Sequence, residues 1–173
     1  MGEYAPEAIE WLGTQAAGQL GATVSGIVGD ARHTSGYHRS RNWIMTFGRK
    51  ERDYSVQLPE DKQGDGDAAS ALDLSFPPDK MKVITALLQR SALDSRDWRI
   101  HYLREFIGTL DGSRVYRRDV YKREDDWGNT DRSHLEHVHL GFLRKYANDF
   151  EAMKWILSVM ARIQHSCHQP HQG

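Results

Sequence analysis

The densest group of side chains able to do chemistry is the run Ser-His-Leu-Glu-His-Val-His at residues 133–139. His137 and His139 stand two residues apart, and residues two apart on a β-strand point to the same face. Both imidazoles can therefore reach one metal ion or the water bound to it. A catalytic Zn²⁺ takes three protein ligands and keeps a fourth position for water, so further ligands must come from elsewhere in the chain.

Two residues elsewhere are candidates for the remaining ligand positions. Asp73 interrupts the small and apolar stretch 69–76, where a buried carboxylate is costly unless it is paired, hydrogen-bonded or bound to a metal. His38 follows Gly36 in a polar segment, and such loops commonly carry functional residues. Each residue alone also fits an ordinary role, as a hydrogen-bonded structural aspartate or an exposed loop histidine. The pattern as a whole indicates metal chemistry.

The other histidines receive no catalytic role from the sequence. We interpret His33, His101 and His134 as ordinary polar residues. Residues 165–173 are polar and are expected to form a frayed tail, so ligand-type side chains there indicate adventitious metal binding at most. Those side chains are His165, Cys167, His168 and His171.

Composition places the chain among ordinary globular proteins. Its 173 residues fit one domain, with a hydrophobic fraction of 39% and an aromatic fraction of 10%. The net charge of −1 gives no overall basic field, which argues against a nucleic-acid partner. The single cysteine excludes an intramolecular disulfide. The oligomeric state does not follow from these numbers.

The N-terminal residues predict neither a signal peptide nor a membrane anchor. Residues 1–19 carry acidic side chains where a signal peptide carries Lys or Arg, and they contain no long apolar run. No stretch of the chain approaches the ~18 consecutive apolar residues of a membrane span. We therefore expect synthesis in the cytoplasm and no membrane partner, with release by lysis or as part of a particle if the protein acts outside the cell.

Hydrophobic periodicity predicts an α+β chain. Helices are expected at 6–20, 79–90, 97–107 and 148–164, and strands at 22–28, 43–47, 54–58, 69–76, 113–121 and 135–142. Residues 29–42, 59–68 and 124–131 are expected to be loops. Long polar insertions between the strands favour an antiparallel sheet with helices packed on one side.

Together these pieces resemble the D-Ala-D-Ala metallopeptidases and their hedgehog-like relatives, a family with a zinc-binding late strand that carries Glu-x-x-His or His-x-His. The run Glu136-His137-Val138-His139 matches both patterns, and Ala71-Leu72-Asp73 looks like the end of the family's Ser-x-His-x-x-Gly-x-Ala-x-Asp segment. The order of motifs looks particularly like peptidase-like proteins of actinobacteria and their phages. The resemblance covers about residues 24 to 160.

The resemblance implies one zinc ion per chain and a hedgehog-like or DD-peptidase-like fold. The family's first histidine would fall seven positions before Asp73, at Gly66, which cannot ligate. His38 is therefore our choice, and the implied ligand set is His38, Asp73 and His139.

The resemblance also implies a general base and a substrate-binding group. Either His137 or Glu136 would be the base: strand alternation favours His137, and a β-bulge would favour Glu136. Arg39 and Arg41 could hold a substrate carboxylate in a bidentate grip, with plain surface charge as the alternative.

The function predicted from this resemblance is zinc-dependent hydrolysis of a peptide bond in peptidoglycan, as in an endolysin or a D-Ala-D-Ala carboxypeptidase. The lack of a signal peptide or a wall-binding domain suits a bacteriophage lysis enzyme or a virion part. One alternative is a non-catalytic structural or binding protein that retains the peptidase fold. A lesser alternative is a metal-dependent phosphodiesterase or nuclease, which the absence of a carboxylate-rich two-metal pattern disfavours.

Overall fold

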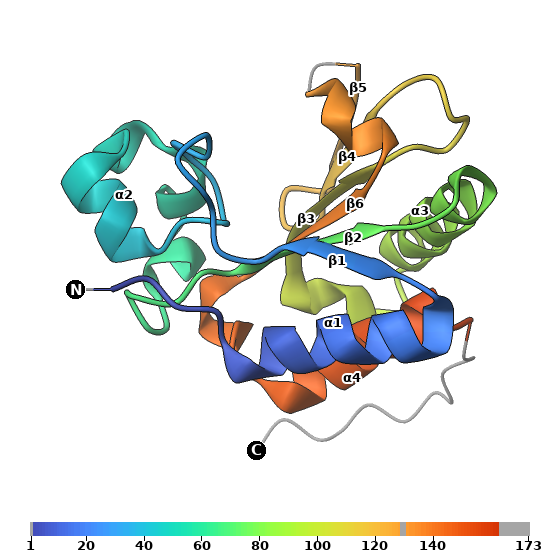
Figure 1. Ribbon diagram of the computed structural model, residues 1–173, viewed down its shortest axis with the longest axis horizontal. Coiled ribbons are helices and arrows are strands. Elements are labelled where there is room, and N and C mark those ends of the chain that lie inside the picture. Colours follow the sequence, from blue (N-terminus) through green and yellow to red (C-terminus); the bar gives the residue numbers. More distant parts are fainter. Residues whose placement is uncertain (1, 129–130, 163–173) are drawn as a thin grey trace.

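The computed structural model describes residues 2–128 and 131–162 (Figure 1). The expected tail at 165–173, including its histidines and cysteine, lies outside the described residues. The described part joins helices from both ends of the chain to one central sheet, and the expected α+β class is confirmed.

The sheet has six strands in the order β1-β2-β6-β3-β4-β5, and every neighbouring pair is antiparallel. Its strands are β1 (Thr23–Gly26), β2 (Ala71–Ser75), β3 (Leu103–Gly108), β4 (Tyr116–Asp119), β5 (Glu124–Trp127) and β6 (Val138–Phe142). The histidine-bearing strand β6 lies between β2 and β3, in the interior of the sheet. Its register sets His139 opposite Asp73 on one side and opposite Ile107 on the other.

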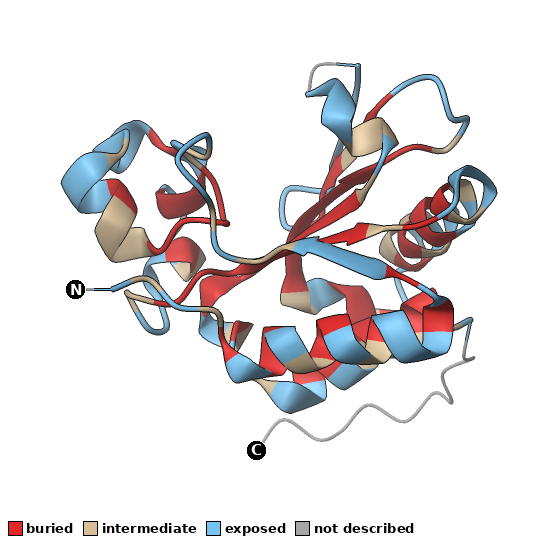
Figure 2. Cartoon of the chain, viewed as in Figure 1, coloured by how far each residue is buried: buried red, intermediate tan, exposed pale blue. Residues whose placement is uncertain are grey.

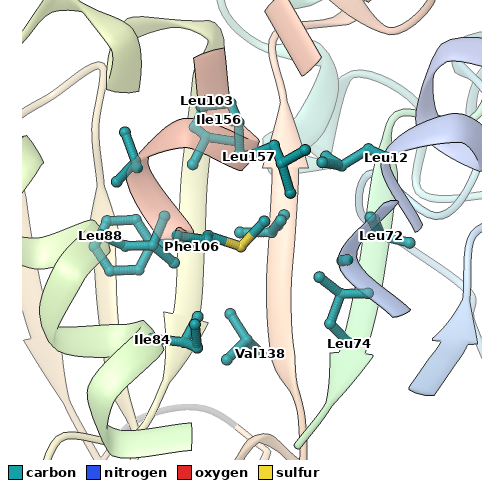
Figure 3. Packing of buried hydrophobic residues seen from close by; sticks show 14 of the residues in the cluster. Leu12, Leu72, Leu74, Ile84, Leu88, Leu103, Phe106, Val138, Ile156 and Leu157 are labelled. Atoms are coloured by element: carbon teal, nitrogen blue, oxygen red, sulfur yellow. The ribbon is translucent and has the colours of Figure 1, made fainter. Parts of the chain in front are cut away.

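Three of the four α-helices in the described part of the chain supply the core that packs on the sheet. The helices are α1 (Glu7–Leu20), α2 (Arg41–Phe47), α3 (Pro78–Leu93) and α4 (Phe150–Met160). Side chains of α1, α3 and α4 share one hydrophobic cluster with strands β2, β3 and β6 (Figure 3). Helix α2 stands apart from these three, within the segment that joins β1 to β2 (Figure 1). No helix among the described residues is long and apolar enough to cross a membrane.

Local sequence signals explain where α1 and α4 begin and end. Helix α1 follows Pro6 and ends at Gly21, whose φ of 68° is the left-handed conformation that glycine adopts at no steric cost. Helix α4 begins after Asp149, whose carboxylate accepts hydrogen bonds from the backbone N–H groups of Glu151 and Ala152.

Alternation along the central strands gives the sheet two different faces. Leu72 and Leu74 of β2 pack with the helices, so Asp73 between them points to the opposite face. Much of the central strands is coloured as buried in Figure 2, and the buried residues on that opposite face include Asp73, Glu105 and His139. The segment between β1 and β2 covers part of this face, since its His38 contacts Asp73. Gly141 makes room for the covering segment, since a Cβ there would lie 3.2 Å from the Tyr37 ring and 3.0 Å from Glu105.

The segment 43–47 forms helix α2, so the strand predicted there is wrong. Its bulky and β-branched residues favoured a strand, but the Ser40 hydroxyl accepts a hydrogen bond from the Trp43 N–H and caps a helix instead. The strand expected at 54–58 is likewise replaced, by a short 3₁₀ helix at Tyr54–Val56 that Asp53 caps.

The helix predicted at 97–107 is also wrong: a 3₁₀ helix at Trp98–Tyr102 runs directly into β3. All six residues of β3 are buried, and a strand covered on both faces loses the alternation that distinguishes it from a helix. Two smaller corrections concern β5, which occupies part of the expected loop 124–131, and β6, which begins at Val138 after a 3₁₀ helix at Arg132–Leu135.

Truncating a core residue of β6 tests this arrangement. Leu140 is fully buried, so Leu140→Ala should lower the free energy of unfolding by about 2–5 kcal/mol, through lost apolar burial and the cavity left behind. Urea denaturation in the presence of a chelator measures the change. The matched control is Leu93→Ala, since Leu93 is 60% exposed and its truncation should cost less than about 0.5 kcal/mol. Equal effects of the two substitutions would contradict the assigned core.

Candidate metal centre

Three side chains from distant parts of the chain converge on the covered face of the sheet. His38 Nε2 lies 3.1 Å from Asp73 Oδ2, His139 Nδ1 lies 2.9 Å from Asp73 Oδ1, and the two nitrogens are 3.2 Å apart. All three residues are buried. Donors bound tetrahedrally to Zn²⁺ at 2.0–2.1 Å stand roughly 3.3 Å from one another, so the two nitrogens and the two oxygens of the Asp73 carboxylate lie close enough together to share one ion.

The outer nitrogens of both histidines face acceptors. His38 Nδ1 lies 2.8 Å from the carbonyl oxygen of Ile27, and His139 Nε2 lies 3.6 Å from Glu105 Oε1. A backbone carbonyl only accepts, so His38 Nδ1 must carry the proton. In the neutral ring the Nε2 lone pair then faces a carboxylate oxygen, which requires a cation between them. A shared proton or a metal ion meets that requirement, and the donor set therefore fits a metal.

The charged residues around the centre shift one another's pKa values in the directions that keep them charged. Burial alone would favour neutral His139, but its hydrogen bond to Asp73 and the nearby carboxylate of Glu105 outweigh burial and raise its pKa to about 9. Burial likewise opposes the charge on Asp73, and the bonds from His139 and His38 reverse this and hold its pKa well below the usual range. Glu105 keeps its charge with a pKa of about 2, since His139 and Arg117 together offset its complete burial.

A cavity of about 460 Å³ opens over this centre. Five histidines line it: His33, His38, His134, His137 and His139. The sequence interpretation gave His33 and His134 no role, and the structure brings both of them to the cavity. His101, the other histidine interpreted as an ordinary polar residue, is exposed elsewhere on the 3₁₀ helix that precedes β3. The usable signal for His134 was its place three residues before His137; it lies on the 3₁₀ helix at Arg132–Leu135 that leads to the same opening.

His33 belongs to the group that could hold a metal. One ligand atom from each of His33, His38 and Asp73 lies within 4.8 Å of the others. The closer triangle, with atoms 2.9 to 3.2 Å apart, contains His139 in place of His33. We give the triangle more weight, because its contacts are close to the separations of tetrahedral ligands, whereas the group with His33 is bounded only at 4.8 Å.

The two candidates for the general base occupy different environments. His137 lines the cavity, with Nε2 3.5 Å from Asp73 Oδ2, and burial lowers its pKa below the usual value. His134 stands beside it, with ring centroids 4.9 Å apart, and burial lowers its pKa to about 4. Glu136 is exposed at the end of the 3₁₀ helix and does not line the cavity.

Arg39 and Arg41 have protein partners in place of the expected substrate carboxylate. The buried Arg39 donates to the carbonyl oxygens of Asp30 and His33 and pairs with Glu3. Arg41 donates to the carbonyl oxygens of Lys62 and Gly64. Neither guanidinium lines the cavity over the centre.

A second cavity of about 490 Å³ adjoins the first along the same face of the sheet. Tyr54, Ile107 and His134 line both cavities, so the two openings meet beside the centre. The second cavity carries charges of both signs: Arg104, Arg117, Lys122, Asp119, Glu124 and Asp126. Its position would allow an extended polar ligand to continue from the metal centre toward β4 and β5.

Comparison of the chain with protein-family models, curated proteins and solved structures found no match.

Zinc bound at Asp73 should raise the free energy of unfolding. Zn²⁺ at about 100 times its Kd should raise the free energy of unfolding by about 2.7 kcal/mol, because the assembled ligand set exists only in the folded chain. Urea denaturation with zinc and with a chelator measures the increment. Asp73→Ala should abolish it, whereas Asp79→Ala, at a side chain 96% exposed, should leave it intact. An undiminished increment in Asp73→Ala would place the metal elsewhere.

Proposed function

We propose that this chain is a zinc-dependent peptidase of the D-Ala-D-Ala metallopeptidase kind that hydrolyses a peptide bond of peptidoglycan. The observation that carries the proposal is the triangle of His38, Asp73 and His139, with His137 beside it in an open cavity. Three ligands and an adjoining base are the parts that a single-zinc hydrolase needs.

Zinc is the metal that this donor set favours. Two imidazoles and one carboxylate suit Zn²⁺ better than Ca²⁺ or Mg²⁺, which prefer ligand shells built of oxygen. When bound, the ion lowers the pKa of a water molecule and polarises the scissile carbonyl. Glu105 and the Ile27 carbonyl would hold the ligand rings in the orientation that the triangle requires.

His137 is our assignment for the general base. Its Nε2 is close to Asp73, so it can accept the proton of the attacking water and then protonate the leaving amine. The neighbouring His134 would keep this side of the cavity uncharged, and its Nδ1, 2.8 Å from the carbonyl oxygen of Asp131, fixes the orientation of its ring. Glu136 points into solvent, and we give it no part in the reaction.

The second cavity is our assignment for the peptide that flanks the scissile bond. Arg117 has protein partners for Nε and Nη2, both on Glu105, and the cations beside it include Lys122. These groups would take over the carboxylate-binding role first expected of Arg39 and Arg41. The choice of peptidoglycan as substrate follows from the resemblance of residues 71–73 and 136–139 to the metallopeptidase family.

A second candidate is a non-catalytic binding protein stabilised by zinc. The observation that favours it is His33, which stands near enough to His38 and Asp73 to act as a further ligand. A site with four protein ligands is typical of structural zinc, because no position remains for water.

Substitution of the assigned base separates these functions. His137→Ala should lower kcat for peptidoglycan clearance by roughly 100- to 10,000-fold while zinc content stays at the wild-type level, because the base is lost and the ligands remain. Turbidity of purified cell walls and elemental analysis provide the two readouts. Glu136→Ala and His101→Ala should retain most of the activity.

Two results would argue against the assignment. Loss of activity in Glu136→Ala with an active His137→Ala would make Glu136 the base. A zinc-loaded wild-type protein with no hydrolytic activity would favour the binding protein.

A further inference from the structure

His33 has the surroundings of a metal ligand. Its ring lies against His38, with centroids 5.0 Å apart, and one of its nitrogens belongs to the 4.8 Å group with His38 and Asp73. Its other contact is outward: His33 Nδ1 lies 3.0 Å from Asp30 Oδ1. The backbone N–H of Asp30 also lies 3.3 Å from Nδ1, so both contacts with Asp30 fall on that nitrogen and Nε2 is the one left for a metal.

The same outward contact recurs in His38, His139 and His33. His38 faces the Ile27 carbonyl, His139 faces Glu105, and His33 faces Asp30. Metal-binding histidines almost always donate their remote N–H to such an acceptor, which fixes the ring and raises its basicity. With Nδ1 protonated and Nε2 on the metal, His33 would make this contact to the Asp30 carboxylate, which lies 3.0 Å from Nδ1.

The backbone that carries His33 is held from behind by Arg39. The guanidinium donates from Nε to the His33 carbonyl at 2.7 Å and from Nη2 to the Asp30 carbonyl at 2.5 Å, while Glu3 pairs with Nη1 at 2.6 Å. Gly29 lies under the loop, where an added Cβ would stand 2.7 Å from the His33 Cβ. A buried arginine and a close glycine contact thus fix the position of an otherwise exposed turn.

We propose that His33 is a fourth, exchangeable ligand of the metal centre. In the resting protein Nε2 of His33 completes a four-ligand shell with His38, Asp73 and His139, and an oxygen ligand such as a substrate carbonyl displaces it. This inference rests on the proposed zinc site. A shell of four protein ligands leaves no position for substrate, whereas a hydrolase needs one open position. Displacement of His33 would provide that position.

X-ray absorption of the zinc-loaded protein tests the proposal, because it counts imidazole ligands directly. We expect about three imidazoles in the wild type and about two in His33→Ala, with zinc affinity lowered at least tenfold in a competition assay. Asp30→Asn, which retains His33, should weaken zinc binding by a smaller factor. His101→Ala is the control and should match the wild type. Acetohydroxamate, a small ligand with two oxygens, should reduce the wild-type count from three to two.

The outcomes separate this inference from the function on which it rests. A wild type with two imidazoles, unchanged by His33→Ala, would overturn the role of His33 and leave the peptidase proposal standing. A count that stays at three with acetohydroxamate bound would overturn the exchange. A wild type that binds no zinc would overturn the proposed function together with this inference.

Discussion

The buried carboxylate of Asp73 is the constraint on which the functional face depends. It lies on an interior strand among imidazoles, where a lone charge would be very costly. The cost is offset mainly because His38 from the covering segment and His139 from β6 contact it from two sides. These contacts hold residues 27–38 against the sheet and position the cavity above it. The fold of this face and the site therefore both require that the charge of Asp73 is compensated.

Antiparallel strand pairing fixes the relative positions of Asp73 and His139, two of the proposed metal ligands. Register sets Asp73 beside His139, and the core face of the same strands is anchored by Leu72, Leu140 and the helices. The histidines at the rim of the cavity, His33 and His134, come from a loop and from a 3₁₀ helix. Asp73 and His139 on strands would set the position of the metal, and the two rim histidines would face the ligand that enters the cavity.

The sequence predicted the features that depend on local pattern. It missed those that depend on contacts between the sheet and the segment that covers it. The strands that carry Asp73 and His139 were recognisable from their composition and spacing, and the structure brings His38 to both. The buried strand β3 had no alternation to reveal it, so Glu105, the outer partner of His139, was overlooked. His33 and Arg39 were beyond sequence reasoning because their roles come from a loop folded back over the sheet.

Metal content of the purified protein is the most direct test that His38, Asp73 and His139 form one zinc site. Elemental mass spectrometry should find about one zinc per wild-type chain and per His101→Ala control chain, the count of a single catalytic centre. His38→Ala, Asp73→Ala and His139→Ala should each lose it while remaining folded by circular dichroism. A wild-type protein without metal after zinc is added back, or three folded variants that all retain it, would contradict the account.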